Sequence, residues 1–440
     1  MSADVVVIGA GVAGLSAATA LAERGLVVDV MEARPAAGGR CSAFTDPVSG
    51  ERVDNGQHVL FGCYDETFKF LRRIDAESGV RRQPTLRVGI VDRDGRRSRL
   101  QCPRWPAPMH LAGGLLRWSA LDWVDRVAPL RLVRALRSNR RLPPSMTVRQ
   151  WLLSNGQTDR LIELLWEPLG VAALNESIDV ASAEPFRLVL ARMFSSDRED
   201  SSIALPLVPL DELFVAPSRA LLIGRGGRLE TSSRAQLTFE PQASGLAVRV
   251  RETTTRPRSV ICAVAWYALP EVLPPVVSLS GVVDAARATS ASAIVTVNLW
   301  FDRPVIDEAF VGMPGREMQW IFDKQRLFGE RSSHLSLVSS GADHLVVRRN
   351  DEILDMAVGE VHAAFPASRQ ATITRSIVVR EKRATFSMAP GQPGRPGTVT
   401  SVPGLFLAGD WIDTGLPATI ESAAMSGHRA ADAVLEYLKH

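Results

Sequence analysis

The sequence predicts an α/β fold in which a parallel-sheet domain, assembled from both ends of the chain, is interleaved with an α+β domain. Three observations support this prediction. A β-branched run over residues 5–8 leads into a glycine-rich turn and then a helix. A second strand, glycine turn and helix follow Gly404. The chain of 440 residues is also too long for one compact core, so two domains are expected.

The N-terminal glycine turn has the spacing of a dinucleotide-binding loop. Gly9, Gly11 and Gly14 stand at G-x-G-x-x-G positions. The first glycine permits a tight turn, the second lets the backbone approach a pyrophosphate, and the third lets the helix pack closely on the strand. We expect the helix over residues 15–24, with its N-terminal amides facing that phosphate.

The elements after this helix strengthen the prediction of a dinucleotide-binding site. A second strand is expected over residues 26–31, and Glu32 stands at its end. A carboxylate in that position accepts hydrogen bonds from both hydroxyls of an adenosine ribose. A signal peptide is disfavoured because the apolar run lacks a basic n-region and is flanked by Asp4 and Glu23.

The continuation, Arg34-Pro-Ala-Ala-Gly-Gly-Arg40, resembles the second glycine motif of the FAD-containing amine oxidase and carotenoid desaturase superfamily. The resemblance implies a Rossmann-like FAD-binding domain, in which the Gly-Gly-Arg loop lies along the pyrophosphate and ribityl chain. It further implies that residues 53–64 pass beside the isoalloxazine ring, with Gln57 and His58 facing the reacting carbon. The alternative is that His58 is a structural hydrogen-bonding residue under the flavin.

The closing segment fits the same resemblance. A strand ending in Ala-Gly-Asp at Asp410 implies a carboxylate near the ribityl or phosphate region. The helix expected from about Ala418 points its positive N-terminus at the flavin N1–C2 edge. An adenine-contacting backbone is expected near Gln236. Together these segments predict cofactor contacts at Gly9, Gly11, Val12, Ala13, Gly14, Glu32, Ala33, Arg34, Gly38, Gly39, Arg40, Gly56, Gln57, His58, Gln236, Ala263, Gly409, Asp410, Pro417, Ala418 and Thr419.

The remaining segments divide between two domains. We expect the FAD-binding domain over residues 1–83, 215–280 and 391–440. The substrate domain is expected over residues 84–214 and 281–390, with an antiparallel strand pair over residues 84–100. The helices expected over residues 147–198 should supply apolar walls of a substrate cavity.

Residues 103–141 have the composition of a membrane-contacting segment. They hold Trp105, Trp118 and Trp123, followed by arginines on one helical side, while Leu121, Val124, Ala128, Leu132 and Leu136 fall on the other. Pro129 can divide the helix in two. Tryptophans beside a basic amphipathic helix suit the interface of a membrane. The alternative is a surface helix packed on its own domain.

Composition limits the partners and the compartment. The net charge of +3 is too small to indicate nucleic-acid binding. The four cysteines show no C-x-x-C spacing, so the sequence predicts neither a metal site nor a disulfide framework. No apolar run reaches the roughly 18 residues of a spanning helix. We therefore expect a cytoplasmic protein associated with the inner face of the cell membrane.

Three reactions are compatible with a flavoprotein of this superfamily. Amine oxidation is disfavoured because Gly415-Leu-Pro-Ala418 stands where amine oxidases carry an aromatic residue of a cage, and the chain has only three tyrosines. Two reactions remain: desaturation of a long carotenoid-type isoprenoid, and reduction of a similar substrate. A flavin-free carrier of prenylated partners, like the Rab escort-type proteins, is disfavoured by the intact glycines, Glu32 and Asp410.

Residues 54–64, 166–169, 173–175 and 409–421 resemble the hydroxysqualene dehydroxylase family of bacterial hopanoid synthesis. The resemblance implies a long apolar isoprenoid substrate, whose hydroxyl leaves as water after protonation before hydride arrives from reduced FAD. His58 is the first candidate for the acid, with Asp413 and Glu167 next. Asp413 could instead only hold its loop, and Glu167 could cap a helix. The flavin reductant, a diffusible donor or a partner, is not identified by the sequence.

Overall fold

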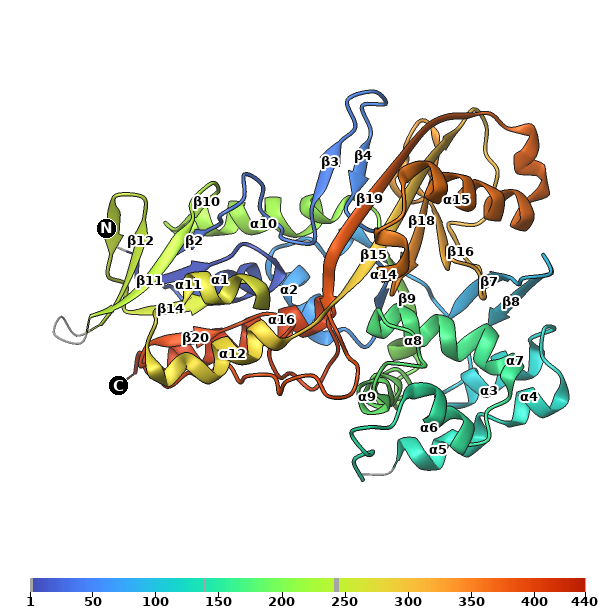
Figure 1. Ribbon diagram of the computed structural model, residues 1–440, viewed down its shortest axis with the longest axis horizontal. Coiled ribbons are helices and arrows are strands. Elements are labelled where there is room, and N and C mark those ends of the chain that lie inside the picture. Colours follow the sequence, from blue (N-terminus) through green and yellow to red (C-terminus); the bar gives the residue numbers. More distant parts are fainter. Residues whose placement is uncertain (1–2, 138–139, 241–244, 440) are drawn as a thin grey trace.

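The computed structural model describes residues 3–137, 140–240 and 245–439, which form two lobes (Figure 1). The first lobe is built on a five-stranded parallel sheet with strand order β10-β2-β1-β14-β20. Its strands are β1 (Val5–Ile8), β2 (Val28–Met31), β10 (Arg228–Glu230), β14 (Ser259–Cys262) and β20 (Leu405–Leu407). The predicted parallel sheet built from both chain ends is confirmed.

Alternate residues of these strands face two different cores, because successive side chains of a strand point to opposite faces. Val5 and Val7 pack against helices, whereas Val6 and Ile8 pack against a smaller antiparallel sheet. The helical face carries α1 (Val12–Glu23), α2 (Asp65–Arg73), α10 (Leu210–Gly224) and α16 (Ile420–Tyr437). The other face carries β11 (Ala235–Glu240), β12 (Gly245–Val250), β13 (Thr253–Thr255), α11 (Leu269–Val272) and α12 (Ser280–Ala288).

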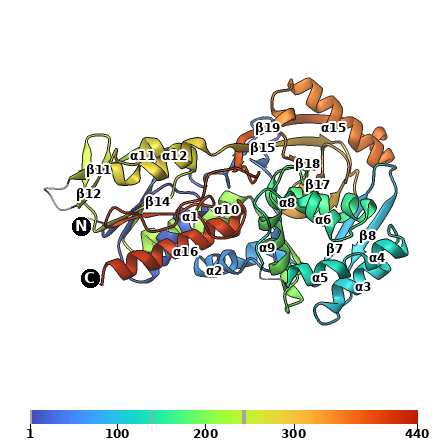
Figure 2. The ribbon, with the colours of Figure 1, turned by 60° about the horizontal axis from the view of Figure 1, so that its bottom comes forward.

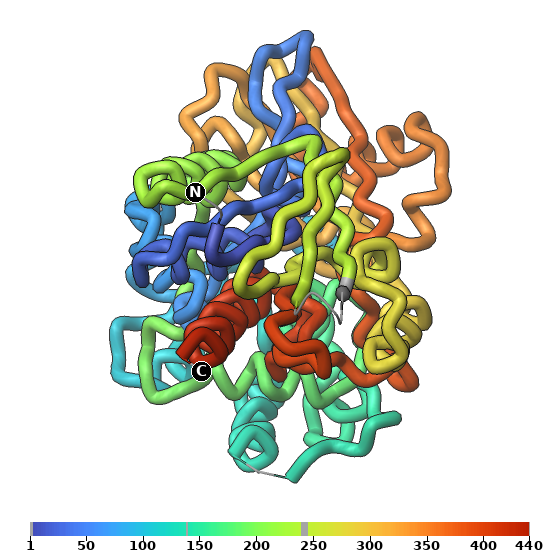
Figure 3. The backbone as a smooth tube through the Cα atoms, turned by 90° about the vertical axis from the view of Figure 1, so that its left-hand side faces the viewer, coloured from blue at the N-terminus to red at the C-terminus, as the bar shows by residue number. Residues whose placement is uncertain are grey.

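Helices α1 and α16 come from opposite ends of the chain and lie side by side, as Figure 3 shows for the dark blue and red segments. Close approach is possible because the contact holds small residues. A Cβ on Gly427 would lie 2.0 Å from Ser16 Oγ and 2.3 Å from the Ala13 carbonyl oxygen. The N-terminal residues of both helices line the same cavity.

The second lobe contains a seven-stranded sheet with strand order β19-β15-β18-β17-β16-β7-β8. Its β7–β8 hairpin confirms the strand pair expected over residues 84–100. The strands are β7 (Arg87–Val91), β8 (Arg97–Gln101), β15 (Ala291–Phe301), β16 (Phe310–Gly312), β17 (Trp320–Asp323), β18 (Ser333–Ser340) and β19 (Ile373–Phe386). Helices α14 (Asp343–Val346) and α15 (Asn350–Ala364) pack on one face, while long β15 and β19 reach back to the first lobe.

A helical layer covers the end of this lobe and has its own apolar core (Figure 2). Pro129 separates two of its helices, as expected for a residue that cannot donate a backbone hydrogen bond inside a helix. The helices are α3 (Met109–Arg117), α4 (Trp123–Val127), α5 (Leu130–Leu136), α6 (Val148–Ser154), α7 (Asp159–Leu161), a π-helical turn (Ile162–Trp166), α8 (Glu167–Leu174) and α9 (Ala183–Met193).

Short elements join the two lobes. They are β3 (Ala43–Thr45), β4 (Arg52–Asp54), β5 (Leu60–Phe61), β6 (Val80–Arg82), β9 (Ile203–Pro206) and α13 (Lys324–Phe328). The boundary expected at residue 215 falls within α10, whose Leu210, Leu213 and Phe214 pack in the same core as α1. Helix α12 also packs in the first lobe through Ala286.

Candidate active site

A cavity of about 1310 Å³ is lined by residues of both lobes. Pockets for single small ligands usually occupy about 300–1,000 Å³, so this cavity has room for more than one molecule. Its first-lobe walls consist largely of glycine loops and charged side chains. Its second-lobe walls are mostly apolar. The predicted cofactor residues on these walls are Gly9, Gly11, Val12, Ala13, Glu32, Ala33, Arg34, Gly38, Gly39, Arg40, Gly56, Gln57, His58, Gln236, Ala263, Gly409, Asp410, Ala418 and Thr419.

The two glycine loops form one backbone cradle. Gly11 and Gly38 form an isolated parallel bridge, and the Gly38 N–H donates to the Ala10 carbonyl oxygen at 2.8 Å. A Cβ on Gly11 would meet no atom within 4 Å, whereas one on Gly39 would lie 3.3 Å from Gly11 Cα. The open space beside Gly11 fits a pyrophosphate held by backbone amides at the α1 N-terminus.

Glu32 is positioned by the backbone around it. Its Oε2 accepts from the Ala10 N–H and its Oε1 from the Arg34 N–H, both at 2.9 Å. These bonds fix the carboxylate at the cavity wall, and each oxygen keeps a further lone pair for a ligand hydroxyl. Gly14 is not at the cavity: a Cβ there would lie 2.0 Å from the Gly9 carbonyl oxygen, so this glycine serves helix–strand packing.

The opposite wall comes from the end of the chain. Arg40 Nη2 donates to Asp410 Oδ1 at 2.5 Å, and Arg40 Nη1 donates to the Ala384 carbonyl oxygen at 2.7 Å. The Asp410 carboxylate keeps the pKa of Arg40 above its usual value in spite of burial. The side chain of Thr419 caps α16 by accepting from the Ser422 N–H at 3.1 Å. The positive end of α16 therefore faces the cavity beside a fixed charge pair.

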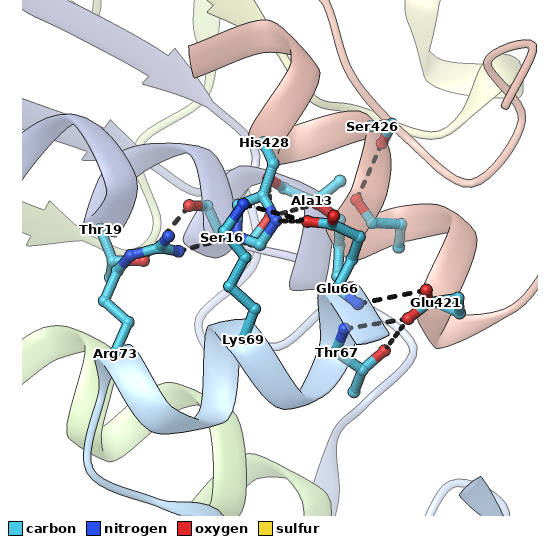
Figure 4. Close-up of polar contacts among 12 residues, drawn as sticks. Ala13, Ser16, Thr19, Glu66, Thr67, Lys69, Arg73, Glu421, Ser426 and His428 are labelled. Atoms are coloured by element: carbon cyan, nitrogen blue, oxygen red, sulfur yellow. Dashed lines mark hydrogen bonds and ion pairs between the residues drawn. The ribbon is translucent and has the colours of Figure 1, made fainter. Parts of the chain in front are cut away.

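Figure 4 shows the polar contacts that hold α16 against α2. The Glu421 carboxylate accepts hydrogen bonds from the backbone of Glu66 and from both the backbone and hydroxyl of Thr67. About two helical turns later, His428 contacts the Glu66 carboxylate through Nδ1 and lies 2.7 Å from Arg73 Nη1 through Nε2. These contacts fix the start of α16, which carries the cavity residues Thr419 and Ile420.

Gln57 and His58 line the cavity from the loop before β5. His58 Nδ1 lies 2.7 Å from the Gly56 carbonyl oxygen, so Nδ1 carries the hydrogen and donates it. Its Nε2 has no partner among the described residues. Burial lowers the pKa of His58 below the usual 6.5, and the Gly56 carbonyl offsets this effect only in part. His58 is therefore a mostly neutral imidazole at neutral pH.

The second-lobe walls are mostly apolar. Helices α8 and α9 contribute Leu169, Ala173 and Met193 among others, so residues 147–198 supply an apolar wall as expected. The sheet adds apolar residues that no sequence pattern assigned to a cavity: Val88, Ile90, Leu100, Ile294, Phe310, Trp320, Phe322 and Val338. Alternation of apolar residues identifies such strands, but it does not say which of them turn toward a ligand.

Four predicted site residues are not among those that line the cavity. They are Gly14, Pro417, Asp413 and Glu167. Asp413 is exposed and lies 3.3 Å from Arg395 Nη2, and Glu167 lies 3.6 Å from Arg149 Nη2. The acid roles expected for Asp413 and Glu167 are not supported by this geometry, although burial raises the pKa of Glu167. Gln236 is at the cavity edge, where its Oε1 accepts from Arg249 Nη2 at 2.6 Å.

The segment over residues 103–141 presents apolar side chains around the cavity mouth. Met109, Leu130 and Val133 line the cavity although they are 58%, 65% and 40% exposed. Trp118 is buried, with its indole nitrogen donating to Ser98 Oγ at 3.0 Å, so it is not available to a membrane surface. On the apolar side of the segment Leu121 and Leu132 are buried, whereas Val124 is exposed.

Comparisons with known proteins agree with this geometry. The model of the family described as Flavin containing amine oxidoreductase matches residues 12–435. The chain is 32% identical over 452 residues to the hydroxysqualene dehydroxylase of Sinorhizobium fredii, with 99% of each chain covered. It is 31% identical over 439 residues to the hydroxysqualene dehydroxylase of Rhodopseudomonas palustris, again with 99% of each chain covered.

A solved oxidoreductase from Methanosarcina mazei has the same fold, with a TM-score of 0.77 at 18% identity over 97% of this chain and 99% of that one. The region matched by the family model begins within the first glycine loop and includes the second glycine loop and the closing Ala-Gly-Asp turn. The chain belongs to the flavin-containing amine oxidoreductase family and is an FAD-dependent oxidoreductase.

Proposed function

We propose that this enzyme removes the hydroxyl group of hydroxysqualene reductively and releases squalene, a precursor of hopanoids and other isoprenoids. The observation that carries the proposal is the cavity itself: a backbone cradle for a dinucleotide opens into a long apolar chamber with few polar groups. A hydrocarbon chain with one polar oxygen is the ligand that such walls favour. The full-length similarity to two hydroxysqualene dehydroxylases supports the same substrate.

We assign the cofactor to the first-lobe walls. The glycine cradle and the α1 N-terminus would hold the pyrophosphate, and Glu32 would accept from the ribose hydroxyls. Arg40, Asp410 and the α16 N-terminus would surround the flavin end. When bound, reduced FAD supplies the hydride, so that alcohol and reduced flavin yield hydrocarbon, water and oxidised flavin. The reductant of the flavin would be a diffusible donor or a partner protein.

His58 is the group we propose to protonate the leaving hydroxyl. It lines the cavity, its ring is oriented by Gly56, and its Nε2 has no partner among the described residues. A lowered pKa makes imidazolium a stronger acid, which favours proton transfer to an alcohol. The same shift reduces the fraction of enzyme that carries the proton at neutral pH. The rate should therefore rise as the solution becomes more acidic.

The apolar walls would protect the reaction. Loss of water from an allylic alcohol leaves a delocalised carbocation, which any nearby water would capture. The second-lobe walls exclude water from most of the chamber, and the aromatic faces of Phe310, Trp320 and Phe322 lie among them. Aromatic faces carry partial negative charge and stabilise a nearby cation.

We further propose that the cavity mouth rests on a membrane, from which an isoprenoid substrate would enter. Met109, Leu130 and Val133 would sink into the lipid, and exposed Arg131 and Arg134 would meet anionic headgroups. Among the described residues no helix is long and apolar enough to span a bilayer. The contact would therefore be peripheral, at the cytoplasmic face.

An anaerobic single-turnover experiment tests the proposed reaction. Chemically reduced enzyme is mixed with hydroxysqualene in detergent while flavin absorbance is followed and the extract is analysed. Flavin reoxidation together with stoichiometric squalene is the expected result. If the reduced flavin does not react, but oxidised enzyme is bleached by a polyene precursor, the chain is a carotenoid-type desaturase instead.

A further inference from the structure

Lys324 is a buried cation beside the cavity. It is the first residue of α13, and its side chain is 1% exposed. Its Nζ donates to Asp54 Oδ2 at 2.6 Å and to Gln57 Oε1 at 2.8 Å. The ammonium also lies 3.6 Å from the centre of the Phe328 ring. Neither the cofactor cradle nor the apolar chamber explains a buried lysine in this place.

The contact with Lys324 fixes which way Gln57 points. An ammonium group has hydrogen-bond donors only, so the oxygen of the Gln57 amide must face it. The amide nitrogen of Gln57 is then the polar end left for the cavity that this residue lines. This Nε2 has no hydrogen-bond partner among the described residues. Gln57 therefore presents an N–H donor to whatever occupies that part of the cavity.

Lys324 is itself held in place. Asp54 neutralises its charge, and the other Asp54 oxygen accepts from the Leu210 N–H at 3.3 Å. Asp54 belongs to β4 and Lys324 follows β17, so the pair joins the two lobes behind the Gln57 loop. A buried ion pair with both partners hydrogen-bonded is a rigid support, because loss of either charge leaves the other unpaired.

The neighbouring residue offers the complementary group. His58 donates from Nδ1 to Gly56, so the Nε2 of the neutral ring is an acceptor. Adjacent residues thus bring one donor and one acceptor to a cavity whose second-lobe walls are mostly apolar. A hydroxyl group both donates and accepts, and it can engage both residues at once. A hydrocarbon can engage neither.

We propose that Lys324 is a positioning residue that turns the Gln57 amide N–H toward the substrate hydroxyl oxygen, so that Gln57 and His58 together select the alcohol over its hydrocarbon product. This inference rests on the proposed function and adds a specificity determinant to it. The selection has a physical basis: when squalene fills the site, the Gln57 N–H is left without a partner, which weakens binding of the hydrocarbon. The same unpaired N–H favours the release of squalene.

Ligand affinity of the oxidised holoenzyme tests the inference, because without reduced flavin no turnover competes with binding. Quenching of protein fluorescence in detergent would give dissociation constants for hydroxysqualene and for squalene. Wild type should prefer the alcohol. Gln57→Leu, which removes the donor and keeps the Lys324–Asp54 pair, should lose about 5–10-fold of that preference. Its affinity for squalene should stay within about twofold of wild type.

Lys324→Met should reproduce the Gln57→Leu result, because the amide is then free to rotate. The matched control is Lys382→Met, since Lys382 is exposed and does not line the cavity. If Lys324→Met does not fold, Gln57→Leu alone decides. Equal weakening of both ligands in Gln57→Leu would make Gln57 a structural residue and overturn the inference. An unchanged preference for the alcohol would overturn it as well.

Failure of the inference and failure of the proposed function have different signatures. If wild type converts hydroxysqualene but Gln57→Leu keeps the full preference, the reaction stands and only the selection mechanism falls. If reduced wild type neither converts hydroxysqualene nor binds it better than squalene, both fall together.

Discussion

Arg40 Nη2 donates to Asp410 Oδ1 at 2.5 Å, which joins two loops 370 residues apart in the sequence. The Asp410 side chain is 5% exposed and that of Arg40 is 28% exposed. The pair closes the cavity between the N-terminal glycine cradle and the C-terminal helix. It directly links the two motifs that predict the cofactor site.

Loss of one partner of this pair should weaken both the fold and cofactor binding. Asp410→Ala leaves the Arg40 cation half-buried, and the cost should approach but not reach the roughly 3–5 kcal/mol of a fully buried pair. Denaturant unfolding and FAD titration of the apoprotein measure the two effects. In a double-mutant cycle, Arg40→Met should cost much less in the Asp410→Ala background than alone. Additive effects would show that the pair is not coupled.

Replacement of His58 should remove turnover and spare the cofactor. His58→Gln should lower the single-turnover rate by about 10²–10⁴-fold, the range of general acid catalysis, while the purified protein keeps its flavin. His344→Gln is the matched control, because His344 is exposed and away from the cavity. A His58→Gln enzyme with the wild-type rate would remove His58 from the mechanism.

The pH profile of wild type offers an independent check on His58. Only the protonated imidazole can act as the acid, and burial lowers its pKa below 6.5. The protonated fraction increases as pH falls, so the single-turnover rate should still be rising below pH 6.5. A rate that is constant between pH 5 and 8, or one that rises with pH, would contradict the assignment.

The exposed apolar rim should determine vesicle binding. A triple Met109→Ser, Leu130→Ser, Val133→Ser variant should bind anionic phosphatidylglycerol vesicles at least about tenfold more weakly in a sedimentation assay, since each large side chain contributes about 1.5–3 kcal/mol when buried. The control carries serine at Val48, Val277 and Val347, which are exposed but outside the cavity lining.

The arginines of the same segment should contribute charge dependence. Arg131→Gln with Arg134→Gln should weaken binding to anionic vesicles by about 1 kcal/mol per arginine and leave neutral vesicles unaffected. The difference should shrink as salt is added, because exposed charges are screened. If the triple serine variant and the double glutamine variant both bind anionic vesicles as strongly as wild type does, this face does not contact a membrane.

Glu421 should stabilise the fold, and its replacement should lower the free energy of unfolding. Glu421→Ala removes the acceptor of the Thr67 backbone, the Thr67 hydroxyl and the Glu66 backbone, and should destabilise the protein by about 1–3 kcal/mol in urea unfolding. Asp432→Ala is the matched control on the exposed side of the same helix. An equal effect of the two variants would show that the α2–α16 contacts carry little energy.

Local patterns in the sequence predict the strands, helices and turns, and the glycine loops that line the first-lobe wall of the cavity. Glycine spacing predicts the turn at Gly9 because few residues adopt its backbone conformation, and Pro129 predicts a helix break because it lacks an N–H. Alternating apolar residues predict the strand pair over residues 84–100. Each of these patterns depends on a few neighbouring residues, so it can be recognised without knowing how the rest of the chain folds.

Which side chains contact each other depends on the packing of segments that are distant in the sequence. Helical spacing puts Val124 on the same side as Leu121 and Leu132, yet Val124 is exposed while the other two are buried, because packing in the helical layer, and not periodicity alone, decides which side chain is buried. Glu167 and Asp413 turn away from the cavity, while Lys324 reaches Gln57 across 267 positions. Such contacts depend on how distant segments pack against each other, and a local pattern carries no information about a partner that folding brings from another lobe.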